Sequence, residues 1–310
     1  MTKILIRFIL FITAIAFIQS CEEITPKPPQ QIIEDPDPDP DPGTDVPVTG
    51  DYAECLNVLS DSTLDVVTWN IEQFSSSNTN TATVTDIIKV MDADIIGVQE
   101  ISSITDFNAM VAAIDGWEAV IVNLSGGLNT GYLYKSSEIT LNGSLTTIYN
   151  DNSSAFPRPP VVGTFTHVSG LQFTIMNLHL KCCGGADNEN RRREASELLK
   201  LYIDQNLSTV AVLVVGDYND ELQDVGSSNV FKVFIDDPNN YLFADMAIAN
   251  GTDANWSFPG WPSHLDHILM TNELFDRWES TSTLKLDDCR DSYEAAVSDH
   301  RPVMARFNVN

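Results

Sequence analysis

The chain has 310 residues, of which 43% are hydrophobic, so it can bury a sizeable core and is not a disordered polymer. It carries 44 acidic against 17 basic residues, a formal net charge of -27. This balance excludes the basic surface of a protein that coats nucleic acid, but not an enzyme that grips phosphate through a metal ion.

The first 20 residues have the pattern of an export signal. Two basic residues flank the start of an apolar run over 4–18, and Ser20 comes directly before Cys21. This order resembles the lipobox of bacterial lipoproteins, which implies a signal peptide over 1–20 and a lipid anchor on Cys21. An ordinary signal peptide or an uncleaved anchor helix is the alternative. The lipoprotein interpretation predicts an exported protein anchored to the outer membrane, on its periplasmic or cell-surface side.

Residues 21–50 are rich in proline and acidic residues, with an alternating Asp-Pro run over 35–42. Proline fixes φ and lacks an N–H, so we expect an extended, self-repelling tether rather than a helix or sheet. Calcium binding by the aspartates is the alternative. The sequence thus predicts one folded domain over 51–310, which we expect to be monomeric.

Four cysteines, Cys55, Cys182, Cys183 and Cys289, lie in this domain. In an exported protein they would allow three disulfide connectivities. The adjacent pair Cys182 and Cys183 permits a vicinal disulfide or two separate partners. We expect structural disulfides rather than a zinc site, since no CxxC or matching histidine spacing is present.

From residue 64 the sequence alternates strands with amphipathic helices. Apolar residues at helical spacing mark two helix faces, Val84, Ile87, Ile88, Met91 and Ala195, Leu198, Leu199, Tyr202, Ile203. Apolar runs predict strands at 64–68, 94–98, 131–134, 161–166, 173–180, 209–215, 265–270 and 302–309. The helices are too few for a plain βαβ repeat. We therefore expect an α+β fold, a four-layer α/β/β/α sandwich with two mixed sheets packed face to face and helices outside.

Six segments place polar residues at the ends of predicted strands, where sheets often present catalytic groups. The first two contribute Asn70 with Glu72, and Glu100. Their amide and carboxylate oxygens are hard donors suited to Mg²⁺, Mn²⁺ or Ca²⁺. An Asn turn after the strand is the alternative for the first segment, and a solvated strand end is the alternative for the second.

The third and fourth segments add an imidazole and a carboxylate. Alternation puts Asn177 and His179 on one face of their strand, and a satisfied core histidine is the alternative for His179. In the next segment, Gly216 lets the backbone turn tightly, so that Asp217 and Asn219 project together. A plain Gly-Asp turn is the alternative there.

The last two segments contribute Asp266 and the dipeptide Asp299-His300 before the final strand. Asp266 could orient the imidazole of His300 and raise its pKa. A surface loop is the alternative for the last segment.

Together and in this order, the six segments resemble the motif set of the endonuclease/exonuclease/phosphatase superfamily, the deoxyribonuclease-I-like fold, over about 64–307. The resemblance implies divalent-metal-dependent hydrolysis of a phosphodiester, with Mg²⁺ as the expected ion and Mn²⁺ or Ca²⁺ as alternatives. The implied metal ligands are Asn70, Glu72, Glu100 and Asp299. The implied catalytic residues are His179, Asp217, Asn219, Asp266 and His300. The implied contacts to substrate phosphate are Arg158 and Asn177.

Two further clusters stand near these segments. The basic run 191–193 is expected to be the solvated start of a helix that opens at Glu194, and contact with substrate phosphates is the alternative. Trp256, Phe258 and Trp261 could stack on a base, a sugar or a lipid headgroup, or they could cap the core.

Three functions follow from the resemblance. A nuclease is the first expectation, because His179 matches deoxyribonuclease-like members. A phosphodiesterase or phosphatase acting on a lipid or small phosphoester, such as sphingomyelin or inositol phosphate, is the second. A catalytically inactive surface-binding lipoprotein is the third, and the intact set of polar residues argues against it.

Overall fold

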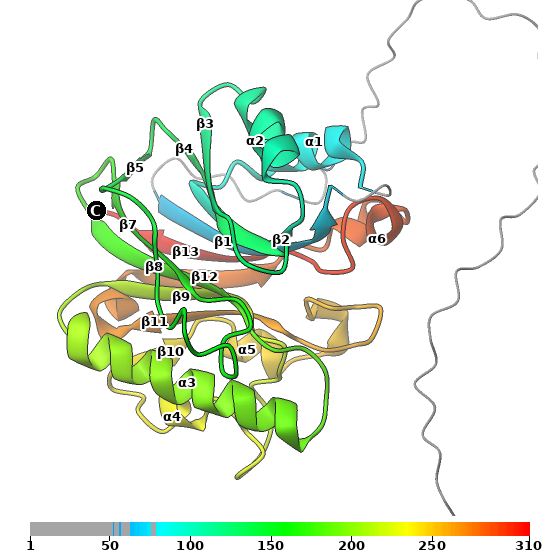
Figure 1. Cartoon of the computed structure of the whole chain (residues 1–310). Coiled ribbons are helices and arrows are strands. Elements are labelled where there is room, and N and C mark those ends of the chain that lie inside the picture. The colour runs from blue at the N-terminus through cyan, green and yellow to red at the C-terminus, as the bar shows by residue number, and fades with distance from the viewer. Residues whose placement is uncertain (1–51, 53–55, 57–62, 76–78) are drawn as a thin grey trace, which may run out of the picture. The chain divides into compact units, whose positions relative to one another are not determined.

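The computed structural model describes residues 52, 56, 63–75 and 79–310 (Figure 1). The expected signal peptide, the anchor on Cys21 and the tether lie outside the described residues, as does Cys55. Within the described residues the strands form two sheets, one of six strands and one of seven. No helix in this part of the chain is both long and apolar enough to span a bilayer.

The first sheet is mixed and has the strand order β12-β13-β1-β2-β4-β3. Only β1 and β2 pair in parallel; the other neighbours are antiparallel. Its strands are β1 (Thr63–Phe74), β2 (Ile95–Ile101), β3 (Trp117–Val122), β4 (Asn129–Lys135), β12 (Trp278–Thr283) and β13 (Val303–Asn308).

The second sheet is also mixed, with the order β10-β11-β9-β8-β7-β5 and β6 paired to β7. Its parallel pair is β8 with β9. Its strands are β5 (Ile139–Leu141), β6 (Thr146–Thr147), β7 (Val161–His167), β8 (Gln172–His179), β9 (Val212–Asp217), β10 (Tyr241–Phe243) and β11 (Asp266–Thr271).

The helices flank the two sheets. Figure 1 shows α1 and α2 beside the first sheet and α3 and α4 beside the second. The α-helices are α1 (Thr81–Met91), α2 (Ile104–Ala112), α3 (Ala186–Asn206), α4 (Lys232–Ile235), α5 (Met246–Ala249) and α6 (Tyr293–Ala296). Within residues 79–310, the 3-10 turns are η2 (Asp253–Asn255), η3 (Asn272–Arg277) and η4 (Leu286–Asp288).

Three apolar cores separate the layers. The middle core joins the facing sides of both sheets, with Val66 and Tyr132 from the first and Phe173 and Val215 from the second. A second core packs α1 and α2 on the outer face of the first sheet, and a third packs α3 and α4 on the second. This arrangement confirms the expected α/β/β/α sandwich of two mixed sheets.

Local patterns predict the elements well where apolar residues recur. The predicted face of Val84, Ile87, Ile88 and Met91 is the buried face of α1. Strands β3, β5, β6, β10 and β12 were not predicted. The strands β5, β6 and β10 have three residues or fewer, and β12 is largely polar, so these four contain no apolar run longer than three residues. The strand β3 does contain an apolar run, over 119–122, which the predicted strands leave out.

The expected start of the second long helix is wrong. The helix α3 begins at Ala186, not at Glu194, so the basic run 191–193 lies inside it. Its first turns are polar and therefore give no apolar periodicity. Arg192 is buried, at 2% exposure, so the expectation of a solvated basic cluster fails for this residue.

Gly216 lies inside a strand rather than in the tight turn that the sequence predicts. It lies within β9 with φ of 149°, and a Cβ there would stand 2.0 Å from the carbonyl oxygen of Leu178 on β8. Close approach of two backbones therefore requires glycine at this position.

Candidate active site

The topology brings all six segments to one edge of the sandwich. The carboxyl ends of the parallel strands β1 and β2 meet at one edge of the first sheet, and those of β8 and β9 meet at one edge of the second. Strands β13 and β11 are antiparallel to β1 and β9, so they begin at that edge. The register pairs Asp217 with His179 on one side and with Asp266 on the other.

Polar side chains from the two sheets touch at this edge. The amide nitrogen of Asn70 on β1 donates to Oε1 of Glu100 at 3.2 Å and to Oδ2 of Asp217 at 3.1 Å. Nε2 of His179 lies 3.5 Å from Oδ2 of Asp217 and 3.7 Å from Oε1 of Glu100. Four residues far apart in the sequence thus form one contiguous cluster.

A carboxylate and an imidazole are paired beside this cluster. Nδ1 of His300 lies 2.7 Å from Oδ2 of Asp266, and both side chains are buried. Burial alone would lower the pKa of His300, but Asp266, with Asp217 and Asp299, raises it to about 10. His300 is therefore an imidazolium at neutral pH.

Two hydroxyl groups fix the loop that carries His300. The Ser298 hydroxyl donates to the Asn70 carbonyl at 2.7 Å and accepts from the His300 amide at 3.0 Å. The Tyr293 hydroxyl donates to the His300 carbonyl at 2.6 Å. The loop before β13 is thereby tied to the strand that carries Asn70.

The remaining titratable groups differ in charge state. Burial raises the pKa of Asp217 to about 7, although the nearby His300 favours its ionised form. Burial also holds the pKa of His179 well below its usual range, so this ring is neutral. The site therefore combines a neutral imidazole, an imidazolium and a carboxyl group that can change its protonation near neutral pH.

The backbone carbonyls of His179 and Leu180 hold the side chains of Asn219 and Arg158. The Leu180 carbonyl accepts from the amide nitrogen of Asn219 at 3.2 Å and from Nη2 of Arg158 at 2.7 Å. Arg158 also donates from Nε to the His179 carbonyl at 3.0 Å.

Two residues of the site have an uncommon backbone conformation. Asn219 and Glu100 have φ of 54° and 61°, in the left-handed region, which is unusual for glutamate. Such backbone conformations often occur at functional sites.

The donor set at this edge fits a divalent cation. Oδ1 of Asn70 is buried and has no hydrogen-bond partner, and it lies on the same side chain that contacts Glu100. Burial and the neighbouring carboxylates raise the pKa of both Glu72 and Asp299. A cation would supply the missing partner for the amide oxygen and the missing positive charge for the carboxylates.

A second polar group, Asp245 with His264 and His267, does not fit a metal ion as well. Among the described residues these three side chains are close enough to share an ion. However, Nδ1 of His264 accepts from the Ser257 amide, so its ring proton belongs on Nε2, 3.1 Å from Asp245. A metal ion on that nitrogen would require the ring to lose its last proton.

This group instead forms a buried ion pair behind the site. Nδ1 of His267 lies 2.6 Å from Oδ2 of Asp245, and its Nε2 lies 2.9 Å from the Asp220 carbonyl. Burial opposes ionisation, yet His267 and His264 hold the pKa of Asp245 below its usual range. The pair supports the loop that follows Asp217.

The structure brings together most of the expected site residues, but it places Asn177 elsewhere. Asn177 is fully buried, and its amide nitrogen donates to the carbonyls of Val98 and Gly131 on the first sheet. Its oxygen accepts from Gln99 at 2.7 Å. The expected contact with substrate phosphate is therefore wrong, because this side chain joins the two sheets. The prediction that Asn177 and His179 lie on the same face of their strand is confirmed.

Sequence reasoning missed Arg192 as a support of the site. Its guanidinium donates to Asp220 at 2.8 Å and to the carbonyls of Lys181 and Cys183. The available signal was its position, three residues before Ala195 on the apolar face of the helix. A buried arginine there needs several acceptors.

The cleft wall contains aromatic residues and thiols. Phe258 packs on the His300 ring at 4.8 Å between centroids, and Trp261 lines the cleft with 77% of its surface exposed. Trp256 instead donates to the Ile248 carbonyl.

The expectation of disulfides at Cys182 and Cys183 is wrong, because both are free thiols, whereas Cys289 is disulfide-bonded.

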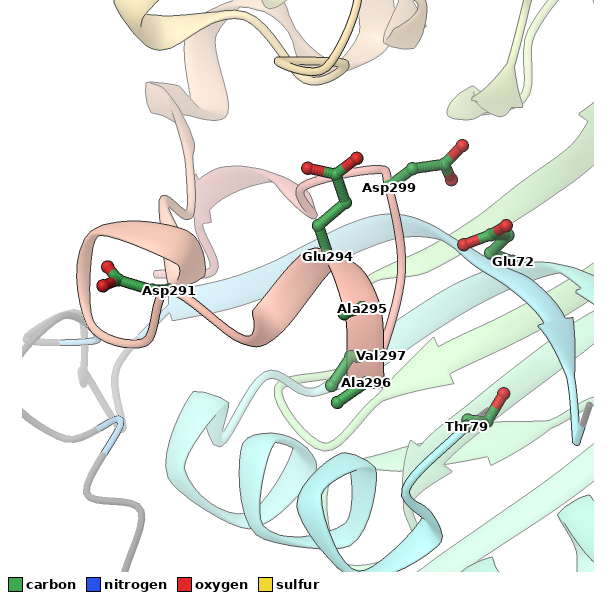
Figure 2. A pocket seen from close by; sticks show the side chains of 8 residues that line it. All are labelled: Glu72, Thr79, Asp291, Glu294, Ala295, Ala296, Val297 and Asp299. Carbon is green, nitrogen blue, oxygen red and sulfur yellow. The ribbon is translucent and has the colours of Figure 1, made fainter. Parts of the chain in front are cut away.

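An acidic groove adjoins the cleft (Figure 2). Figure 2 shows Glu294 and Asp299 projecting from α6 and the loop after it, with Glu72 reaching in from β1. Asp299 lines both the groove and the catalytic cleft. The residues that line the groove are Glu72, Thr79, Asp291, Glu294, Ala295, Ala296, Val297 and Asp299, with no lysine or arginine among them.

Comparisons with known proteins agree with this geometry. The sequence model of the "Endonuclease/Exonuclease/phosphatase family" matches residues 67–300. No curated protein matches the chain. Among solved structures, D. rerio TDP2 complexed with a single-strand DNA product has a TM-score of 0.63 and 16% identity, covering 80% of this chain and 100% of that one.

Two other solved structures are similarly related. The human Nocturnin catalytic domain with bound sulfate has a TM-score of 0.60 and 19% identity, covering 80% of this chain and 94% of that one. A mannosyl-6-phosphatase from Bacteroides thetaiotaomicron has a TM-score of 0.59 and 18% identity, covering 79% of this chain and 99% of that one. At these identities the likeness establishes the fold.

Proposed function

The chain belongs to the endonuclease/exonuclease/phosphatase family, and from that premise we propose that it hydrolyses phosphodiester bonds with the help of a divalent metal ion. Members of this family are hydrolases that act on phosphoester bonds. The observation that carries the proposal is the pair of His300 and Asp266 facing Asp217 next to the unpartnered buried oxygen of Asn70.

Each residue of the cluster has its own role in the proposed hydrolysis. Asp217 accepts the proton of the water that attacks phosphorus, and Asn219 orients that water. The imidazolium of His300 donates a hydrogen bond to a phosphate oxygen, where negative charge grows as the bond to the leaving oxygen breaks. Asp266 keeps that ring charged and correctly turned. Arg158, fixed by two carbonyl groups, adds positive charge to the same region.

Asn70 and Glu100 would hold the metal ion, with Glu72 and Asp299 as further ligands or as partners of water. Mg²⁺ is the proposed ion, and Mn²⁺ or Ca²⁺ are the alternatives. When bound, the ion acts as a Lewis acid that stabilises negative charge on phosphoryl oxygen.

The test is hydrolysis of bis-p-nitrophenyl phosphate by the purified protein with Mg²⁺ or Mn²⁺, with chelator, and with the variant His300→Ala. We expect turnover that chelator abolishes and that His300→Ala lowers by about 10²- to 10⁴-fold. Turnover that withstands chelator and the substitution would contradict the proposed chemistry. Indifference to metal and absence of turnover on a broad phosphoester panel would favour a surface-binding protein.

Two substrate classes are compatible with this chemistry. Nucleic acid is the class expected from the sequence, and a structural neighbour is solved with a DNA product. A small phosphoester is favoured by a specific observation, the acidic groove next to the cleft. A long polyanion binds through many cationic contacts outside the reacting phosphate. Beyond the proposed metal ligands Glu72 and Asp299, the lining of this groove instead adds two further acidic residues, Asp291 and Glu294.

The exposed ring of Trp261 suits a small substrate as well, since an indole can pack on a sugar or a headgroup. The discriminating experiment compares plasmid DNA with small diesters under the same metal conditions. Cleavage of the small diesters alone, and equally well at low and high salt, supports the second class. Cleavage of the plasmid with a steep fall at high salt supports the first.

We further propose that the protein is exported and anchored through a lipid on Cys21, with 21–50 as its tether and a monomeric domain beyond. The support is the order of the basic, apolar and lipobox segments in the sequence. The test is the mass of the mature protein and its partition into membranes, compared with Cys21→Ser. A soluble mature protein that begins elsewhere would contradict the anchor.

A further inference from the structure

We propose that Cys182 and Cys183 form a redox-active dithiol in the wall of the catalytic cleft, which closes to a vicinal disulfide by exchange with an external disulfide. Both residues are free thiols and both line the cleft together with His179, Asp217 and His300. Nothing in the hydrolysis described above uses a thiol. The pair is therefore a modification site separate from the catalytic groups.

The geometry suits this reaction. The two Sγ atoms lie 2.8 Å apart, and Nζ of Lys181 lies 3.4 Å from Sγ of Cys182. Burial disfavours the thiolate of Cys182, but the hydrogen bonds from Cys183 and Lys181 outweigh it and lower its pKa. Cys183 is exposed, so an external disulfide can reach the pair. These are the features that make a cysteine reactive.

The exchange proceeds in two balanced steps. The Cys182 thiolate attacks one sulfur of a small-molecule disulfide, whose S–S bond breaks to release a thiolate that takes up a proton. The Cys183 thiol then loses its proton, and its sulfur attacks Sγ of Cys182, which releases the second external thiol. Two protein thiols are oxidised to one disulfide while the external disulfide is reduced to two thiols.

Formation of the Cys182–Cys183 disulfide would affect the catalytic site through a shift of the backbone. A disulfide usually joins Cα atoms about 4.4–6.8 Å apart, and adjacent Cα atoms are about 3.8 Å apart, so the segment must adjust. Arg192 holds the carbonyls of Lys181 and Cys183. The preceding carbonyl, of Leu180, holds both Asn219 and Arg158. Movement of 181–183 therefore displaces groups that orient water and phosphate.

The test uses the full-length protein, incubated with oxidised or reduced glutathione, alkylated, and cleaved with trypsin. Cleavage after Lys181 and Arg191 gives a peptide over 182–191 that contains both thiols. After the oxidised treatment we expect this peptide to take up no alkyl group and to weigh two hydrogens less. Two alkyl groups, or glutathione retained on both cysteines, would overturn the proposal. This readout does not depend on the proposed hydrolysis.

Hydrolysis of bis-p-nitrophenyl phosphate is measured on the same samples. Oxidation should lower the rate by about tenfold, and added thiol should restore it. The double variant Cys182→Ser/Cys183→Ser should not respond, and because it retains Cys289, it also reports any effect on that residue's disulfide. A closed ring with an unchanged rate would overturn the link to the catalytic site.

The single variants separate the two sulfurs. Cys183→Ser should stop at a mixed disulfide on Cys182, formed about tenfold faster than the mixed disulfide on Cys183 in Cys182→Ser. Equal rates would overturn the assignment of Cys182 as the attacking sulfur.

Discussion

Single residues in this site owe their properties to their immediate partners. His300 is charged because buried Asp266 lies 2.7 Å from it, whereas His179, equally buried, has no such partner on its Nδ1. Two histidines of one cleft thus take opposite charge states. Both rings are buried, so the difference comes from their charged neighbours. Asp266, with Asp217 and Asp299, raises the pKa of His300, whereas burial together with Arg158 and His300 lowers the pKa of His179.

The first prediction concerns this carboxylate. The variant Asp266→Asn removes the negative charge that raises the pKa of His300, so the imidazolium should lose its proton at lower pH. The alkaline limb of kcat/KM should move to lower pH by at least about one unit. The measurement is a pH–rate profile with a small diester. Asp237→Asn, in an ion pair with Lys200, serves as the matched control, and equal profiles for both variants would contradict the prediction.

The second prediction concerns the proposed metal ligand Glu100. Mg²⁺ that binds only the folded state raises its stability, by about 2.7 kcal/mol at 100 times Kd. Glu100→Gln should lose most of the Mg²⁺-dependent rise in Tm, measured by thermal unfolding with and without the ion. The control is Glu118→Gln, an exposed carboxylate that accepts from Tyr134. A full rise in Glu100→Gln would place the ion elsewhere.

At the scale of elements, the helix α3 supports the cleft from outside the sheet. Arg192 occupies a buried position on its packed face, in series with Ala195 and Leu199. From there it reaches Asp220 on one loop and two carbonyls on another. A helix that packs on a sheet thus also sets the relative position of two catalytic loops.

The third prediction follows from that role. Arg192→Ala leaves Asp220 and two carbonyls without their donor and should lower the free energy of unfolding by about 3–5 kcal/mol. Urea denaturation measures the loss. The neighbouring Arg191→Ala is the control, because Arg191 is only half-buried and donates to two loop carbonyls rather than to a carboxylate, and we expect it to cost less than about 1 kcal/mol. Equal losses of unfolding free energy in Arg192→Ala and Arg191→Ala would contradict a stabilising role for the contacts of Arg192.

At the scale of the whole molecule, the site exists because two sheets meet. Asn70 and Glu100 belong to the first sheet, whereas His179 and Asp217 belong to the second. Their distances therefore depend on the packing of the sheets against each other. Asn177 is one buried polar link between them, through Val98 and Gly131. The hydroxyl of Tyr132, which lies 2.7 Å from the Val161 carbonyl, is another.

The fourth prediction tests this link. Asn177→Ala removes the side-chain donor to two buried carbonyls and one of the acceptors of Gln99, which keeps its bonds to Thr68 and Gly97. It should cost about 2–4 kcal/mol of unfolding free energy. It should also lower kcat, because the metal-binding and proton-accepting groups lie on different sheets. Asn142→Ala, which removes one exposed contact to Thr166, is the control. Denaturation and steady-state rates measure both effects, and a stable, fully active Asn177→Ala would refute the link.

The sequence by itself determined the positions of eight of the described strands, the main helix faces and the polar residues of the six segments. These features are local: an apolar run, a helical spacing or a carboxylate after a strand depends on neighbours in the chain. The motif order also indicated the family, and the sandwich followed from the mixture of strands and helices. The sequence did not determine the strand ends, since β1 runs to Phe74 and includes Asn70 and Glu72. Polar beginnings of helices, as at Ala186, leave no such local signal.

Only the tertiary structure decided which polar residues act on one another. It assigned Asn177 to the joint between the sheets, made Arg192 a buried clamp and left Cys182 and Cys183 as free thiols at the cleft. Each outcome depends on partners dozens of residues away or on the space around a side chain. Local periodicity carries no information on such contacts, because they arise from packing between sheets and helices.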